Sequence, residues 1–285
     1  MTSIVIWSNY HSDEYLPGLW AVSDSRVSAS GNVLTDNFQK LTALQGYAYN
    51  KGDFQRRQPR HVFTVGVACA GSTLISTTVR DFISAIVSDL EEVEYMDAPN
   101  MPFEEKIPSL QDIAKLMARV ATQYVLDMGQ HYPRNARIEI ALYGLCPRSD
   151  RLRIFKIQNS ADSPASVTHI EVPVGGDALC IMGERTDHIE RTVRSHQAET
   201  QAGSLQHARA PIAALWDIAA DETYATIGGP LQLSVAGRFG VKSIPLMARD
   251  SVVQRFVGID LAEEGGHIGG FSYMRSLGLC FPWNP

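Results

Sequence analysis

The order of its apolar segments limits what this chain can fold into more than any other feature. Strand-like runs come first, at residues 2–7, 19–23, 38–44 and 61–70. Apolar residues then recur at three- and four-residue spacing from 72 to 90 and from 109 to 128, which predicts two amphipathic helices. The order then repeats, with predicted strands at 137–145, 151–157, 167–172 and 178–182, helices at 184–200 and 205–220, and strands at 231–236 and 238–247. Segregated runs of this kind favour an α+β fold of two antiparallel sheets packed together and flanked by helix pairs.

Polar, glycine-rich or proline-containing stretches separate these segments. They predict loops and turns at residues 8–18, 28–37, 45–60 and 91–108. Ser72 or Thr73 is suited to cap the first helix, and the second begins near Ser109. The tail contains two Gly-Gly pairs and several aromatic residues that suggest docking, for instance on a neighbouring subunit. We therefore expect one domain over residues 1–247 and a C-terminal extension over 248–285.

The charge balance bears on the class of partner. The formal net charge is −6, whereas general binding to nucleic acid or to an anionic membrane needs a positive face. The basic cluster at residues 56–60 leaves a local basic patch open, with a solvated loop as the alternative. No apolar run approaches the roughly 18 residues of a membrane-spanning helix, and no basic segment precedes a long apolar one at the start. We expect no nucleic-acid partner, no membrane contact and no signal peptide.

Cysteine and histidine usage indicates neither a disulfide framework nor a metal site. The four cysteines are widely scattered and form no CxxC pair: Cys69, Cys146, Cys180 and Cys280. The eight histidines show no spacing typical of metal ligands. This pattern is typical of reduced, buried thiols in a cytosol. We therefore expect a cytoplasmic protein with no structural metal and no cofactor.

A few polar residues at strand ends are the strongest candidates for a functional site. Asp24 follows a nearly continuous apolar run, and a carboxylate at the edge of a buried strand needs a cationic or hydrogen-bonding partner. Lys40 lies sixteen positions further on, within the next predicted strand. Gly71 lies where the strand at 61–70 passes into a helix. Thr2 opens the first strand. We expect these four residues to belong to one site.

These residues resemble a known family. The order Asp24-Ser25-Arg26 after a strand, Lys40 on the next strand, and Gly-x-Ala-x-Ala-Gly-Ser into a helix is similar to the proteasome β-subunit family. Its bacterial relatives include the HslV-type peptidase and the Anbu group. The Asp-to-Lys spacing equals that of the family, and residues 225–231, Ala-Thr-Ile-Gly-Gly-Pro-Leu, resemble its late Gly-Gly segment. The resemblance covers residues 2–90 well and 136–236 loosely.

The resemblance implies a four-layer αββα sandwich and an N-terminal threonine hydrolase. Members of the family cleave peptide bonds and assemble into closed rings, which implies a homo-oligomeric ring acting on peptides or unfolded proteins. Thr2 would be the nucleophile after removal of Met1, and Lys40 with Asp24 would support it. Gly71 would supply an oxyanion N–H group, and Ser28 would line the substrate channel. The sequence leaves open whether a regulatory ATPase binds.

The chemistry of these residue types agrees with such a role. A threonine hydroxyl is a poor nucleophile and needs a base. A free α-amine has a pKa near ~8, so it can accept the proton at neutral pH, the more so when a nearby ammonium lowers its pKa. Lys40 would be that ammonium, and Asp24 would hold it in place.

Several features depart from the family pattern. The first loop and the stretch at 45–60 are longer than usual. Glu184 follows Gly183 where the family has a serine, and Tyr224 and Ile227 occupy its late polar positions. Asp221 or Glu222 could substitute only with a gap.

Other interpretations therefore stay open. The chain could be a catalytically inactive ring or scaffold subunit, with Asp24 and Lys40 a purely structural ion pair. It could also be an amidase of the same fold that acts on small molecules.

Overall fold

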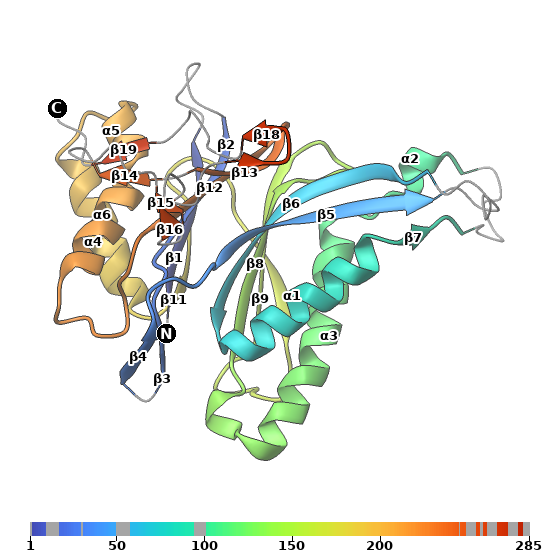
Figure 1. Cartoon of the computed structure of the whole chain (residues 1–285), viewed down its shortest axis with the longest axis horizontal. Helices are drawn as coiled ribbons and strands as arrows, with labels where there is room; N and C mark the ends of the chain where they lie inside the picture. The colour runs from blue at the N-terminus through green and yellow to red at the C-terminus, as the bar shows by residue number, and fades with distance from the viewer. Residues whose placement is uncertain are drawn as a thin grey trace. The chain divides into compact units, whose positions relative to one another are not determined.

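The chain combines helices with several mainly antiparallel sheets (Figure 1), an architecture compatible with the predicted α+β class. The computed structural model describes residues 2–9, 17–29, 31–49, 58–93, 101–244, 246–248, 255–256, 259–260, 267–272 and 279–281. The chain divides into two compact units. The first comprises Met1–Thr42, Gly175–Val235 and Lys242–Pro285, and the second comprises Ala43–Val174 and Ala236–Val241.

The first unit is built on a five-stranded sheet in the order β11-β1-β2-β12-β13. Its strands are β1 (Ser3–Asn9), β2 (Gly18–Ser23), β11 (Leu179–Gly183), β12 (Gln232–Gly237) and β13 (Gly240–Ile244). β1 is antiparallel to both of its neighbours, β2 and β11. All residues of β2 are buried, as the continuous apolar run predicts for a strand covered on both faces.

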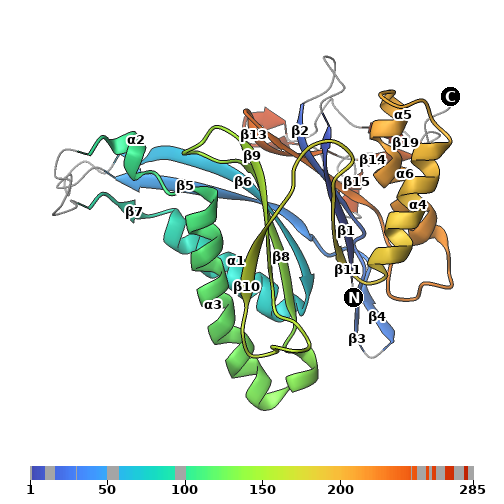
Figure 2. The same cartoon turned by 180° about the vertical axis from the view of Figure 1, so that it is seen from behind.

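Helices cover one face of this sheet. They are α4 (Thr186–Ala198), α5 (Leu205–Ala208) and α6 (Ala210–Ala220), and Figure 2 shows α4 and α6 side by side. Val5 and Trp7, two residues apart on β1, share a hydrophobic cluster with Ile189 of α4 and Leu215 of α6. Because alternate residues of a strand share one face, this face of β1 packs against the helices.

The second unit contains a six-stranded sheet in the order β10-β9-β8-β6-β5-β7. Its strands are β5 (Leu41–Tyr49), β6 (Arg60–Gly71), β7 (Leu90–Glu91), β8 (Ile138–Leu145), β9 (Leu152–Gln158) and β10 (Thr168–Val172). The helical segments are α1 (Thr73–Val87), α2 (Phe103–Lys106), α3 (Leu110–His131) and the short 3-10 helix η1 (Pro133–Asn135). α1 and α3 pack against each other and against this sheet.

Short strands complete the first unit. A hairpin joins β3 (Val27–Ala29) to β4 (Asn32–Thr35). The tail contributes β14 (Leu246–Ala248), β15 (Arg255–Phe256), β16 (Ile259–Asp260), β17 (His267–Ile268), β18 (Phe271–Ser272) and β19 (Leu279–Phe281). β19 pairs in parallel with β14, so the end of the predicted extension is joined to the residues that precede it. The boundary at 247 and a contact with a neighbouring subunit stay predictions.

Helix starts follow the predicted capping chemistry. The Ser72 side chain accepts a hydrogen bond from the Ile75 amide at the start of α1. Ser109 and Asp112 form a reciprocal capping box at the start of α3. The predicted hairpin of residues 137–157 is also confirmed, as β8 and β9. No helix in the described part of the chain combines the length and apolarity that crossing a bilayer requires.

The strand predicted at 38–44 is shifted. It begins at Leu41 and runs to Tyr49, so Lys40 precedes the strand instead of lying on it. The predicted loop at 45–60 is wrong for residues 45–49, and residues 50–57 lie outside the described ones. The glycine at position 46 favours a loop in the sequence, but here it has a different role. A Cβ at this position would collide with the Phe63 ring, so Gly46 makes room for an aromatic side chain inside a sheet.

Other corrections concern element ends. The helix predicted at 205–220 is broken at Arg209, because Pro211 lies in the first turn of α6, where a proline without an N–H group is tolerated. The turn predicted at 28–37 contains the β3–β4 hairpin, which reverses at Gly31 with a φ of 84°. The loop predicted at 91–108 contains the short helix α2.

Candidate functional site

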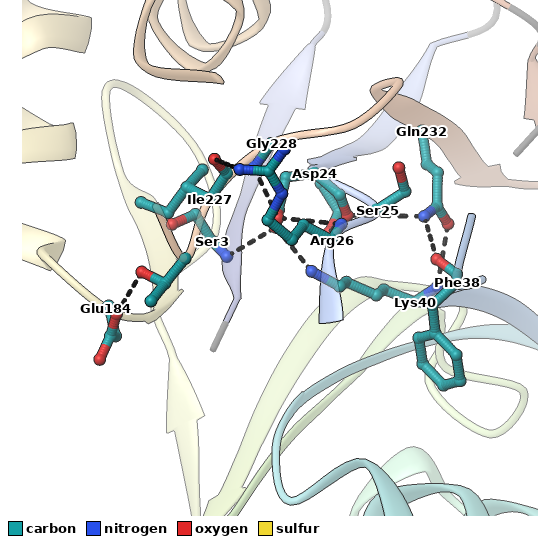
Figure 3. A network of polar contacts seen from close by, with 12 residues as sticks. Ser3, Asp24, Ser25, Arg26, Phe38, Lys40, Glu184, Ile227, Gly228 and Gln232 are labelled. Atoms are coloured by element: carbon teal, nitrogen blue, oxygen red, sulfur yellow. Dashed lines mark hydrogen bonds and ion pairs between the residues drawn. The ribbon is translucent and has the colours of Figure 1, made fainter. Parts of the chain in front are cut away.

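Asp24, at the end of β2, is the centre of a buried polar network in the first unit (Figure 3). Its side chain is 0% exposed, yet both oxygens are fully engaged. Oδ1 accepts hydrogen bonds from Lys40 Nζ at 2.8 Å and from the Ser3 amide at 2.9 Å. Oδ2 accepts from the amides of Gly228 at 3.2 Å and Arg26 at 3.3 Å. Four donors from separate parts of the chain thus offset the cost of burying a carboxylate.

Lys40 is the cation of this network. Its side chain is 1% exposed, and within the described chain its ammonium bonds to Asp24. Burial lowers the pKa of Lys40 below its usual value, and the charge of Asp24 opposes this without cancelling it. An ammonium has three hydrogens, so two remain for other groups. Lys40 is therefore a cation that releases its proton more easily than an exposed lysine.

Gln232, at the start of β12, holds the segment that carries Lys40. Its Oε1 accepts a hydrogen bond from the Lys40 amide at 2.9 Å, and its Nε2 donates to the Phe38 carbonyl at 2.6 Å. The side chain is 6% exposed. Because both ends of one planar amide are engaged, Gln232 fixes the backbone of this short segment and thereby the direction of the Lys40 side chain.

A second ion pair, between Arg26 and Asp36, connects the network to the Gly-Gly segment at residues 225–231. Arg26 donates to Asp36 through Nε at 2.6 Å and through Nη2 at 3.1 Å, which lowers the pKa of the Asp36 carboxyl. Arg26 also donates to the Ala225 carbonyl at 3.2 Å. A Cβ on Gly228 would lie 2.6 Å from the Arg26 guanidinium carbon. The glycine therefore lets the guanidinium approach the backbone that bonds Asp24.

Thr2 lies directly before β1 and is 6% exposed. Its carbonyl accepts a hydrogen bond from the Glu184 amide at 2.9 Å. The next amide, of Ser3, bonds the Asp24 oxygen that also holds Lys40. The peptide bond between Thr2 and Ser3 therefore contacts the carboxylate of the buried ion pair directly. The structure brings together Thr2, Asp24 and Lys40, which the sequence placed in one site.

Gly71 and Ser28, the other two predicted residues, are less closely tied to this network. Gly71 ends β6 in the second unit with a φ of 81°, and a Cβ there would lie 2.8 Å from the Arg137 carbonyl oxygen. Ser28 lies half-buried in β3, where it pairs with Val33 of β4. An oxyanion role for Gly71 and a channel role for Ser28 stay predictions.

The structure adds residues that the sequence did not assign to the site. Gln232 is one, and a polar residue at the head of an apolar strand after Gly-Gly was an available signal. Glu184 and Thr226 are others: Thr226 Oγ1 donates to Glu184 Oε2 at 2.8 Å. Tyr224, noted as a departure from the family pattern, bonds His188 of α4 at 3.0 Å. Among the described residues no group of three or more His, Cys, Asp or Glu residues is arranged to hold a metal ion.

Comparisons with known proteins do not identify this chain. No protein-family model matches it, and no curated protein sequence matches it significantly. Any functional assignment therefore depends on the chemistry of the site described above.

Proposed function

We propose that this chain is an N-terminal threonine hydrolase of the proteasome β-subunit type, a peptidase that uses the hydroxyl of Thr2. One observation carries the proposal. The amide that follows Thr2 and the ammonium of Lys40 bond the same oxygen of the buried Asp24. A buried cation is thus held beside a threonine that becomes the chain terminus when Met1 is removed.

The reaction has balanced proton transfers. The α-amine of Thr2 takes the hydroxyl proton while the oxygen attacks the peptide carbonyl. The amine then gives the proton to the leaving nitrogen, and water hydrolyses the resulting ester, returning the hydroxyl to Thr2. Lys40 lowers the pKa of the α-amine through its charge, which keeps the amine in the neutral form that accepts the hydroxyl proton. Gly71 would stabilise the oxyanion through its N–H group.

The ion pair itself favours a functional role over a purely structural one. A buried pair is weak support for stability, because desolvation offsets much of the attraction. Lys40 bonds one partner in the described chain, so its ammonium keeps two hydrogens for other groups. Asp24 thus orients the Lys40 ammonium while two of its hydrogens stay available for donation.

The proposal includes the fold and assembly that the resemblance implies. These are a four-layer αββα sandwich, a closed homo-oligomeric ring in the cytoplasm, and peptides or unfolded proteins as substrates. The antiparallel sheets and the helices packed on each of them support the fold. Light scattering of the purified protein measures the assembly, and a monomer at all concentrations would overturn the ring.

Intact mass and turnover test the activity. The purified chain should begin at Thr2 and hydrolyse unfolded casein or short fluorogenic peptides. Thr2→Ala and Lys40→Ala should each abolish turnover while keeping the circular dichroism spectrum. Lys156→Ala is the matched control, because it removes a lysine paired with Glu139 outside this network and should leave turnover unchanged.

The alternatives are outcomes of the same experiment. A retained Met1, or turnover that survives in either site variant, overturns the proposal. A processed chain that hydrolyses neither peptides nor proteins points to an inactive subunit. Hydrolysis of small amides alone points to an amidase.

A further inference from the structure

Glu184 lies beside Thr2 on the side away from the ion pair. In the first sheet β1 runs between β2 and β11, so Asp24 follows one neighbouring strand and Glu184 follows the other. The Glu184 amide donates to the Thr2 carbonyl at 2.9 Å. Thr2 therefore lies between two acidic residues: Asp24 bonds the amide that follows Thr2, and the backbone amide of Glu184 bonds the Thr2 carbonyl.

The backbone on both sides of Glu184 has an uncommon conformation. Gly183 has a φ of 94°, and a Cβ on it would collide with the Thr2 carbonyl oxygen. Arg185 has a φ of 56°, which is unfavourable for a residue with a side chain. The Arg185 guanidinium stacks on the Tyr224 ring at 4.7 Å, which holds this turn in place. The chain thus turns sharply around Glu184 and keeps it next to Thr2.

One oxygen of the Glu184 carboxylate accepts a hydrogen bond. Oε2 accepts from the Thr226 hydroxyl at 2.8 Å, and within the described chain the other oxygen, Oε1, has no partner. Thr226 lies two residues before Gly228, whose amide bonds Asp24. One loop therefore fixes both acids that flank Thr2.

The remaining charges near Thr2 are already paired. The titratable and charged groups on the surrounding elements include Asp24, Arg26, Asp36, Lys40, Glu184, Arg185, His188 and Tyr224, of which Arg185 stacks on Tyr224 and Tyr224 bonds His188. Asp24 is bonded by four donors, and Asp36 is bonded by both arms of Arg26. Among these acids, Glu184 is left with an open acceptor.

We propose that Glu184 is a positioning residue whose open oxygen accepts a hydrogen bond from the α-ammonium of Thr2. The inference depends on the proposed function, because that ammonium exists only when Thr2 is the first residue. The bond orients the nitrogen that must take the hydroxyl proton. It also raises the pKa of the α-amine, whereas Lys40 lowers it, so the two side chains together set the pH at which the terminus can act as a base.

The test measures the terminus directly. The chain is labelled with ¹³C-threonine, and the carbon shifts of Thr2 are followed by NMR from pH 5 to pH 10. Glu184→Gln should lower the α-amine pKa by about one unit, because it removes an opposite charge next to the ammonium. The acid limb of the kcat/KM profile should move to lower pH by a similar amount. Thr226→Val, which releases the carboxylate without removing it, should give a smaller shift.

Controls separate this role from a structural one. Glu190→Gln removes the same charge from the exposed face of α4, where Glu190 pairs with Arg194, and should leave the titration unchanged. Glu184→Asp keeps the charge and should restore most of the wild-type pKa. An unchanged pKa in Glu184→Gln, or an equal shift in Glu190→Gln, overturns the inference.

The inference and the proposed function can fail separately. A shifted α-amine pKa in a chain that hydrolyses nothing supports the role of Glu184 and overturns the activity. Turnover with an unchanged α-amine pKa in Glu184→Gln supports the activity and overturns the role of Glu184. A chain that retains Met1 overturns both.

Discussion

Replacing Asp24 by asparagine should destabilise the chain strongly, because it breaks a buried ion pair from one side. Asparagine offers one acceptor oxygen where the carboxylate offers two. If that oxygen keeps Lys40 and Ser3, the amide NH₂ group meets the donors of Gly228 and Arg26, which then lack an acceptor. Each buried unsatisfied donor costs about 1–3 kcal/mol. Removing one partner of a buried pair costs about 3–5 kcal/mol in total.

Urea unfolding at pH 7 measures this loss. With a slope of about 2 kcal/mol per molar urea, the midpoint should fall by roughly 2 M. Asp150→Asn is the matched control, since Asp150 pairs with Arg238 at the surface and the two side chains are 59% and 78% exposed. An exposed pair of this kind contributes about 0–1 kcal/mol. A loss in Asp24→Asn no larger than that of the control would refute the reasoning.

The pH dependence of the same variant has a definite sign. The pKa of Lys40 is lowered in the folded chain, so between that pKa and about 10.4 the unfolded chain binds more protons and stability rises with pH. Asp24→Asn removes the charge that opposes this lowering, which extends the window to lower pH. The deficit of the variant should therefore shrink as the pH is raised from 7 to 10. A deficit that grows over this range would contradict the lowered pKa.

Three further predictions follow from the network and the core. Gly228→Ala should displace the Arg26 guanidinium and reduce turnover, with a stability loss of about 1–3 kcal/mol in thermal unfolding. Gln232→Ala should free the segment that carries Lys40 and lower kcat about tenfold, a change of about 1.4 kcal/mol in the barrier. An unchanged kcat would show that the hydrogen bonds of Gln232 to this segment do not matter for turnover. Burial raises the pKa of the Cys69 thiol to about 12, so iodoacetamide at pH 8 should not label it in the folded chain, as peptide mass spectrometry can check.

The sequence was informative where one residue type has few physical alternatives. A carboxylate at the end of a buried run needs a cationic or hydrogen-bonding partner, and Asp24 bonds both Lys40 and backbone amides. Serines before apolar periodic stretches do cap helices, as Ser109 does. These inferences depend on local chemistry and on short separations along the chain.

The sequence was uninformative where distant residues decide the outcome. Gln232 bonds the Lys40 amide across 192 positions, and no local pattern records such a contact. The local sequence predicts a loop at Gly46, because the Phe63 ring that requires a glycine there lies on another strand. The local sequence around Glu184 shows only a departure from the family pattern, since its hydrogen-bond partner Thr226 is 42 positions away.

The donors around Asp24 come from two widely separated segments of the first unit, which are synthesised at different times. The amides of Ser3 and Arg26 leave the ribosome early, whereas the Gly228 amide follows some two hundred residues later. A nascent chain shorter than this lacks part of the cradle that orients Lys40. Under the proposed function, the chain should therefore gain hydrolase activity only after Gly228 has been synthesised.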